Sequence, residues 1–378
     1  MDFDLRAHTI LLAVAGSRAY GLHTDSSDID LRGVALPPVR RLLSLHPEFD
    51  QADDQGEIAV FMADLPPEEQ AIARESGLEG SVYGLRKLVR LASDCNPNIL
   101  DVLFCDEAHL RRVSPAGERL RAERRLFLST RARHTYAGYA RAQLKRIRNH
   151  RQWLLEPPKR EPTRADFGLP DMPEIPGEQL AAAEAAVRKK MDGWEIDYGE
   201  LPGSQVVALQ ERIAEVLAEQ ELGADALWAS AARHVGLSDN LIDHMQRERS
   251  YTAAHRHYKQ YRHWLVSRNP DRAALEAAHG YDTKHAAHLV RLLRMGREVI
   301  TTGQVNVWRG DIDADELRAI RGGAWSYDRL IEETEAEFDA LQRIPRSAWA
   351  VPDTVDREAI DQLVHELLAS HVGIAPVS

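Results

Sequence analysis

Two patterns of hydrophobic and polar positions divide the chain. Short apolar runs separated by Gly, Ser, Asp and Pro fill residues 1–107, which is typical of strands alternating with helices. The continuous apolar run Ile10–Val14 predicts a buried strand. The alternating run Asp28–Val34 predicts a second strand, with Ile29 and Leu31 facing one way and the carboxylates the other. Two further elements are predicted nearby: a helix over Tyr83–Ala92 and a short apolar element over Asn98–Phe104.

Beyond residue 107 the apolar positions recur at helical spacing. A proline cluster near residues 157–176 predicts an extended connection between helices. We therefore expect an α+β fold, with an α/β head over 1–110, a helical middle region over 111–265 and a C-terminal helical region over 266–378. The predicted helices cover Glu118–Trp153, Ser204–Glu221, Ser238–Arg268, Lys284–Thr301, Ser326–Arg343 and Arg357–Ser370.

The composition is that of an ordinary soluble globular protein, and three further features lead us to expect a cytoplasmic one. The first residues lack the basic region of a signal peptide, and the apolar run Thr9–Ala15 is too short to cross a bilayer, so we expect no membrane segment. Cys95 and Cys105 have no metal-ligand spacing, which predicts reduced core residues. A net charge of −11 argues against a protein that coats nucleic acid non-specifically, but local basic surface could still bind a nucleic-acid end.

The chemistry is carried by Gly16-Ser17 and, ten residues later, by Ser27-Asp28-Ile29-Asp30. Asp28 and Asp30 project from the same face of a strand and can share divalent ions, for which oxygen ligands suit Mg²⁺ or Mn²⁺. A glycine after a strand lets the backbone approach a phosphate closely, so the Gly16-Ser17 turn and Ser27 are predicted phosphate ligands. An isolated Asp-x-Asp is weak evidence, because it also occurs at solvated strand edges. The Gly-Ser turn upstream makes nucleotidyl transfer the favoured interpretation.

This motif resembles that of the DNA polymerase beta-like nucleotidyltransferase superfamily, and within it the branch typified by RNA-repair-associated polymerase-beta-like proteins. Further stretches with this resemblance are Leu85–Leu100, Arg268–Pro270 and Gly280–Leu292. The resemblance implies a head with a mixed sheet, NTP as the substrate, transfer of a nucleoside monophosphate and release of pyrophosphate. It also implies a third carboxylate, which falls at Glu79. Asp64 and Glu57 are competitors for this role, and Glu79 can equally be a surface residue.

A basic row follows in the C-terminal region. Lys284, His288 and Arg291 lie at positions i, i+4 and i+7 of a predicted helix and share one face. Periodicity alone favours a solvated basic face, whereas the resemblance favours a triphosphate clamp. Asp282 is expected to cap this helix and not to bind metal.

Two stretches, Tyr136–Trp153 and Tyr251–Trp264, interleave basic and aromatic residues. Such stretches can bind RNA through phosphates and bases, although buried aromatics with a solvated charged face are more common. Their histidines form no His-x-x-x-His pair, so no zinc is expected. P-loop, dinucleotide-binding and Gly-x-Ser-x-Gly motifs are absent.

The acceptor implied by the resemblance is an RNA end. Transfer to a protein or to a small molecule, as in toxin-antitoxin or antibiotic-modifying relatives, remains an alternative. A nucleotide-binding protein without catalytic activity is another.

Overall fold

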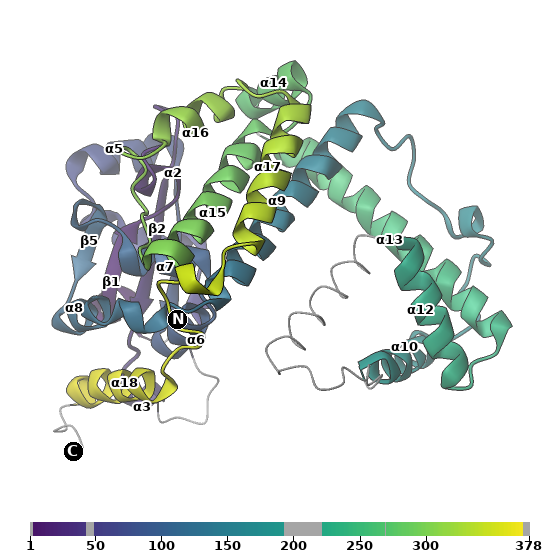
Figure 1. Ribbon diagram of the computed structural model, residues 1–378, viewed down its shortest axis with the longest axis horizontal. Helices are drawn as coiled ribbons and strands as arrows, with labels where there is room; N and C mark the ends of the chain where they lie inside the picture. Colours follow the sequence, from purple (N-terminus) through teal and green to yellow (C-terminus); the bar gives the residue numbers. More distant parts are fainter. Residues whose placement is uncertain (1–2, 43–48, 193–220, 269, 373–378) are drawn as a thin grey trace. The chain divides into compact units, whose positions relative to one another are not determined.

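The computed structural model describes residues 3–42, 49–192, 221–268 and 270–372 (Figure 1). The chain forms two compact units, which are described separately. Met1–Leu155 and Pro270–Ser378 make the first unit, and Glu156–Asn269 make the second. The fold is α+β, as predicted, with a mixed sheet near the N-terminus followed by helices. The functional boundaries expected after residues 110 and 265 stay a prediction.

Within the described residues, the first unit has one sheet of five strands in the order β3-β4-β2-β1-β5. β2 lies antiparallel to β1 and parallel to β4, while β3 and β5 join the edges in antiparallel orientation. The sheet places the end of β1 beside the start of β2. Its strands are β1 (Thr9–Val14), β2 (Ile29–Ala35), β3 (Gln51–Ala52), β4 (Leu78–Gly84) and β5 (Leu110–Val113).

The two faces of the sheet are covered by different helices. Ile29 and Leu31 of β2 are fully buried in a core that also contains residues of α4 (Gln55–Ile58), of the 3₁₀ helix η1 (Ala59–Asp64) and of α5 (Pro67–Ser76). Val34 of β2 belongs to the other core, which holds α6 (Leu85–Ser93), α7 (Pro97–Phe104) and α15 (Thr283–Thr302). Because side chains alternate along a strand, the polar positions of β2 lie on the same side as α15.

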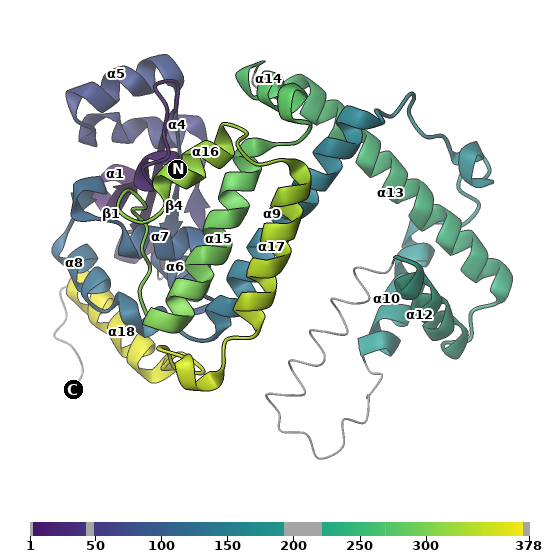
Figure 2. The ribbon, with the colours of Figure 1, turned by 45° about the horizontal axis from the view of Figure 1, so that its top comes forward.

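α15 packs along α9 (Arg131–Leu155), and Figures 1 and 2 both show the two helices side by side. A Cβ added at Gly296 would lie 2.8 Å from Tyr136 Cβ, which explains the close approach of the two helices there. At the other end, the rings of His150 and His285 are 5.7 Å apart. The helices are therefore antiparallel, and the C-terminal region completes the core of the N-terminal one.

The remaining elements of the first unit surround this core. N-terminal ones are α1 (Leu5–His8), α2 (Gly16–Ala19), α3 (Val39–Leu42), η2 (Glu107–His109), α8 (Pro115–Ala122) and η3 (Arg124–Phe127). C-terminal ones are α14 (Pro270–His279), α16 (Ala314–Arg321), α17 (Tyr327–Gln342), η5 (Arg346–Ala348) and α18 (Arg357–Val372).

The described elements of the second unit are all helices, and the chain before α10 is mostly without regular structure. It contains η4 (Arg164–Phe167), α10 (Gly177–Asp192), α12 (Glu221–His234) and α13 (Asp239–Ser267). Its small core includes Val187, Trp228 and Met245, and Arg164 pairs with Glu248. The Ser238 hydroxyl caps α13 by accepting a hydrogen bond from the Leu241 amide.

Most predicted elements are confirmed within one or two residues, including both strands and the last three helices. Two differ. Tyr83 ends a strand instead of starting a helix, because β4 pairs with β2 along its length and α6 begins only at Leu85. The long helix over Glu118–Trp153 is interrupted at η3, where Phe127 and Leu128 turn into the core. The predicted helix over 204–221 lies outside the described residues except for its last position.

Both cysteines are free and buried, as expected. None of the helices in the described ranges is long and apolar enough to cross a membrane.

Candidate active site

A tight turn after β1 places the backbone of Gly16 against the carboxylate of Asp30 on β2. Gly16 has φ +63° and starts α2, and the Ala15 amide donates a 2.7 Å hydrogen bond to the Asp30 carbonyl. A Cβ added at Gly16 would lie 3.0 Å from Asp30 Oδ2. The glycine is therefore required by its conformation and by the nearby carboxylate. Ser17 follows on α2 and is partly exposed.

Three carboxylates gather at the start of β2 and β4. Asp30 and Glu79 are directly paired in the parallel register, and Asp28 immediately precedes β2. Burial raises the pKa of the Asp30 carboxyl, and the negative charges of Asp28 and Glu79 raise it further. Arg32 and Lys284 act in the opposite direction. The structure thus brings together the three acidic residues predicted from the sequence, in a group whose mutual repulsion a cation would relieve.

A polar cavity of about 410 Å³ opens beside these carboxylates. Asp30 and Glu79 line it, together with four polar residues that sequence reasoning missed: Arg32, Asp53, Gln55 and Ser81. Arg32 could have been found, because it continues the alternation of Asp28 and Asp30 along the strand. The others could not, since only the pairing of β3 with β4 brings the region around Asp53 to this edge.

The competing acids are placed differently. Asp64 ends η1 and accepts hydrogen bonds from Arg6 at 2.7 Å and from Arg112 at 3.1 Å. Its carboxylate is nearly buried in this network, so its charge is already balanced. Glu57 lies on α4 and is not among the residues that line the cavity. The geometry favours Glu79 as the third carboxylate.

Arg18 and Ser27 shape the loop before Asp28. Arg18 donates hydrogen bonds to the carbonyls of Asp28 at 3.0 Å and Ser27 at 2.7 Å. The Ser27 hydroxyl accepts a 2.9 Å hydrogen bond from the Thr24 amide and is almost buried. Its observed contacts hold the loop, and its role as a phosphate ligand stays a prediction.

The basic row of α15 divides into an exposed end and a buried end. Lys284 is exposed and close enough to Asp30 to lower the pKa of that carboxyl. His288 is mostly buried, and burial followed by the charge of Arg291 lowers its pKa well below the usual value, so it is neutral. Of the three predicted phosphate ligands on this helix, only Lys284 is open to solvent near the carboxylates.

Arg291 is 1% exposed and interacts with buried groups. Its guanidinium carbon lies 3.6 Å from the ring centroid of Tyr20, and its Nη1 lies 3.7 Å from Asp101 Oδ2. Tyr20 donates a 2.5 Å hydrogen bond to the same Asp101 carboxylate. Because Tyr20 directly follows α2, Arg291 ties α15 to the Gly16-Ser17 turn. These contacts favour a positioning role for Arg291 over direct contact with a phosphate.

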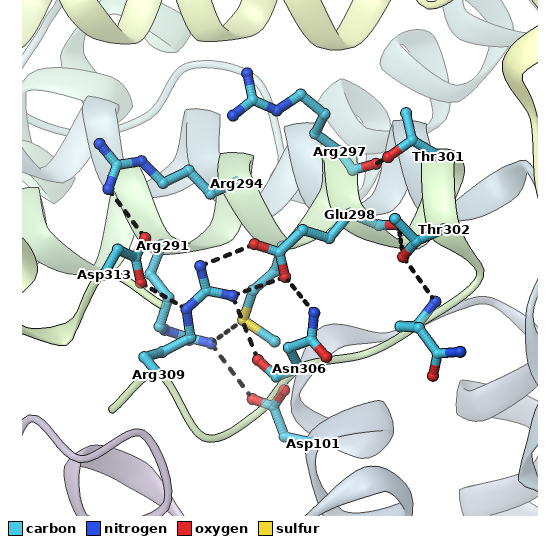
Figure 3. Close-up of polar contacts among 12 residues, drawn as sticks. Asp101, Arg291, Arg294, Arg297, Glu298, Thr301, Thr302, Asn306, Arg309 and Asp313 are labelled. Atoms are coloured by element: carbon cyan, nitrogen blue, oxygen red, sulfur yellow. Dashed lines mark hydrogen bonds and ion pairs between the residues drawn. The ribbon is translucent and has the colours of Figure 1, made fainter. Parts of the chain in front are cut away.

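The segment between α15 and α16, together with α16 itself, contacts the loop that follows α2. Arg309 is fully buried, and its guanidinium donates to Glu298 at 2.8 Å and to Asp313 at 2.7 Å (Figure 3). Its backbone amide donates to the Tyr20 carbonyl at 3.3 Å. The next two carbonyls of the loop also accept hydrogen bonds from arginines, namely Gly21 from Arg318 and Leu22 from Arg321.

A second polar cluster lies at the start of α15. Asp282 caps the helix, as predicted, by accepting a hydrogen bond from the His285 amide at 3.0 Å. The ligand atoms of His150, Asp282 and His285 lie within 4.8 Å of one another, which is close enough for a metal ion. However, Asp282 Oδ2 also accepts hydrogen bonds from Arg272 and so already has a cationic partner. The expected absence of zinc stays a prediction.

Comparison with known proteins agrees with this geometry. Residues 4–155 match the family described as the RNA repair pathway DNA polymerase beta family. No curated protein and no solved structure matches the chain. The matched segment contains the Gly16 turn and all three carboxylates. Residues 4–155 are therefore similar to a family of polymerase-beta-like nucleotidyltransferases, the one described for RNA repair.

Proposed function

We propose that the protein transfers a nucleoside monophosphate from an NTP to an acceptor hydroxyl at an RNA end, with release of pyrophosphate. The observation that carries this proposal is the group of Asp28, Asp30 and Glu79 beside the Gly16 turn. Acids held so close repel one another unless a cation or a proton joins them. Their position at one end of two neighbouring strands suits a reaction on a bound triphosphate.

The donor set fits Mg²⁺ or Mn²⁺. The groups are carboxylate oxygens, which hard divalent cations prefer, and Asp30, Asp28 and Glu79 would hold the ions. The absence of a side chain at Gly16 leaves the space beside Asp30 Oδ2 open. When bound, the metal would neutralise the triphosphate and polarise the phosphate that is attacked.

The remaining residues would bind and orient the substrates. Backbone amides of the Gly16-Ser17 turn and the Ser17 hydroxyl would hold phosphate oxygens, and Lys284 would pair with the charge of the leaving pyrophosphate. Glu79 is exposed on the strand next to Asp30 and can accept the proton of the acceptor hydroxyl. The family description supports RNA as the acceptor.

Transfer of label tests this proposal. The full-length protein is incubated with each α-³²P-labelled NTP, Mg²⁺ or Mn²⁺, and single-stranded RNA, DNA or protein acceptors. We expect labelled RNA that requires a divalent cation and a free terminal hydroxyl. Asp28→Asn and Asp30→Asn should abolish labelling, while Asp64→Asn, on the opposite face of the sheet, should retain it. Equal labelling by the Asp30→Asn variant would refute the mechanism, and labelling of protein alone would refute the RNA acceptor.

A further inference from the structure

α9 is strongly basic in a protein whose net charge is −11. No Asp or Glu occurs between Arg124 and Leu155, a segment that contains nine Arg and Lys residues. The family match and the carboxylate site give no role to this charge. Basic residues on a helix can hold neighbouring helices in place or remain available to a ligand, and the structure separates these two uses on α9.

Four of the arginines on α9 are used within the protein. Arg131 pairs with Asp94 at 3.0 Å. Arg133 and Arg141 lie over the rings of Trp349 and Phe338, at 5.6 and 5.3 Å. Arg151 donates a 2.9 Å hydrogen bond to the Gly280 carbonyl and lies over the ring of Tyr327. These contacts attach α9 to neighbouring parts of the first unit, and they account for the four arginines without a ligand.

The other three, Lys145, Arg146 and Arg148, form what we call the α9 basic ridge. All three are exposed, and within the part of the chain that the structure describes no acidic side chain pairs with them. They fall within about one turn of helix and spread around its outward side. Lys145 and Arg148 are three residues apart and neighbour each other, while Arg146 lies on the flank that bears His150, one turn further on. Three unneutralised cations so close together repel one another, which an anionic ligand would relieve.

The ridge lies beside the end of α15 that faces the carboxylates. The ring of His150, one turn after Arg146 on α9, lies 5.7 Å from the ring of His285 on the first turn of α15. In agreement with this, the charge of Arg146 contributes to lowering the pKa of both His285 and His288. Lys284, on the same turns, in turn lowers the pKa of Asp30. All these residues belong to one compact unit. Positive charge therefore continues from the edge of the candidate active site to the ridge.

We propose that the α9 basic ridge binds the phosphodiester backbone of single-stranded RNA whose end is the acceptor at the carboxylates. This inference rests on the proposed function. A strand of RNA presents phosphates at regular intervals, and up to three of them can pair with the ridge. The ridge residues are all cations, so it recognises the backbone and not the sequence of bases. Recognition of any exposed RNA end suits an enzyme of RNA repair.

Binding is measured without catalysis, so that it does not depend on the proposed reaction. The probe is a fluorescent 12-nucleotide single-stranded RNA, titrated with full-length protein in EDTA without NTP at several salt concentrations. The ridge variant combines Lys145→Gln, Arg146→Gln and Arg148→Gln. The matched control removes the same charge at Arg131, Arg343 and Arg346, which are exposed and paired with acids. Thermal melting checks that both variants fold.

We expect the ridge variant to bind the RNA at least tenfold more weakly at low salt. Its slope of log K against log salt should be shallower by about 2, because each RNA phosphate paired with a cation contributes roughly 0.7 to the slope. The control should bind within about twofold of the wild type. The proposal would be overturned if all three proteins bound the RNA equally or if both variants were weakened equally. It would also be overturned if a polyglutamate peptide displaced the RNA as well as unlabelled RNA does. Failure of the proposed function shows separately, as absence of label transfer by a protein whose RNA binding still requires the ridge.

Discussion

Two groups of charged residues lie on the same side of the sheet, but one is open to solvent and the other is buried and paired. At the edge, Asp28 and Glu79 repel the charge of Asp30, and Asp30 and Glu79 line an open cavity. Further inside, Asp101 is buried with Arg291 and with the hydroxyl of Tyr20. The first group has more negative charge than its neighbours balance, whereas the second is balanced within the protein. Open and uncompensated charge suggests a ligand, and closed and compensated charge suggests a structural role.

The largest effect should come from removing a charge of the open group. Asp30→Asn is expected to reduce nucleotidyl transfer by about a thousandfold or more, because the carboxylate would no longer hold the cation that the reaction requires. The free energy of unfolding should stay equal or rise slightly, since the substitution removes a half-buried negative charge near two others. Label transfer and urea denaturation measure the two effects. A clear loss of stability would place Asp30 in the structural class.

Next in size is the closed group. Arg291→Met is expected to destabilise the fold by about 3–5 kcal/mol, because it leaves Asp101 buried without its cation. Urea denaturation gives the free energy of unfolding. Adding Asp101→Asn to the same variant should restore part of the stability, since the uncompensated charge then disappears. A wild-type stability for Arg291→Met would show that this arginine is free to bind a ligand after all.

Gly16→Ala should reduce both nucleotidyl transfer and stability, each by a moderate amount. The new methyl group would require a left-handed backbone that alanine disfavours, at a cost of about 1 kcal/mol. It would also lie 3.0 Å from Asp30 Oδ2, where it would crowd a bound cation or phosphate. We expect transfer to fall about 10- to 100-fold with only a small drop in melting temperature. Gly138→Ala is the control, because Gly138 is at an exposed position of α9 where a Cβ meets no atom within 4 Å.

The smallest effect is a dependence of stability on pH. Burial lowers the pKa of His285 to about 4 and that of His288 well below its usual value. Below the unfolded pKa of about 6.5, the unfolded chain binds more protons than the folded one, so the free energy of unfolding falls as the pH drops. Between pH 7 and pH 5, the free energy of unfolding of His288→Gln should decrease by on the order of 1 kcal/mol less than that of the wild type. Urea denaturation of both proteins at pH 7 and pH 5 measures this difference. An equal decrease in the free energy of unfolding for wild type and variant would contradict the prediction.

Much of the open group could be predicted from sequence because its parts are local. Gly16, Asp28 and Asp30 are close along the chain, and alternation along one strand determines which way the acids point. Glu79 was placed only by resemblance, since its pairing opposite Asp30 depends on β4, which the local pattern did not reveal. Asp53 and Gln55 could not be predicted, because they reach the cavity through sheet pairing at a distance.

Helical spacing likewise placed Lys284, His288 and Arg291 on one face, but it could not separate their roles. Periodicity reports direction around a helix axis and not depth in the surrounding core. Lys284 lies where α15 is open to solvent, while Arg291 lies where Tyr20 and Asp101 cover it. The same limit applies to α9, whose basic residues look alike in sequence although four dock neighbouring helices and three remain exposed.

The sequence by itself determined the α+β organisation, the strand-turn-strand motif with its carboxylates and most helix boundaries, because these depend on local spacing and backbone preference. The tertiary structure alone decided which charges are balanced. It set Glu79 beside Asp30, buried Arg291 against Asp101 and left the α9 basic ridge open near Lys284. Charge balance depends on residues far apart in the chain, and a charge becomes available to a ligand where packing leaves it open to solvent and only partly compensated.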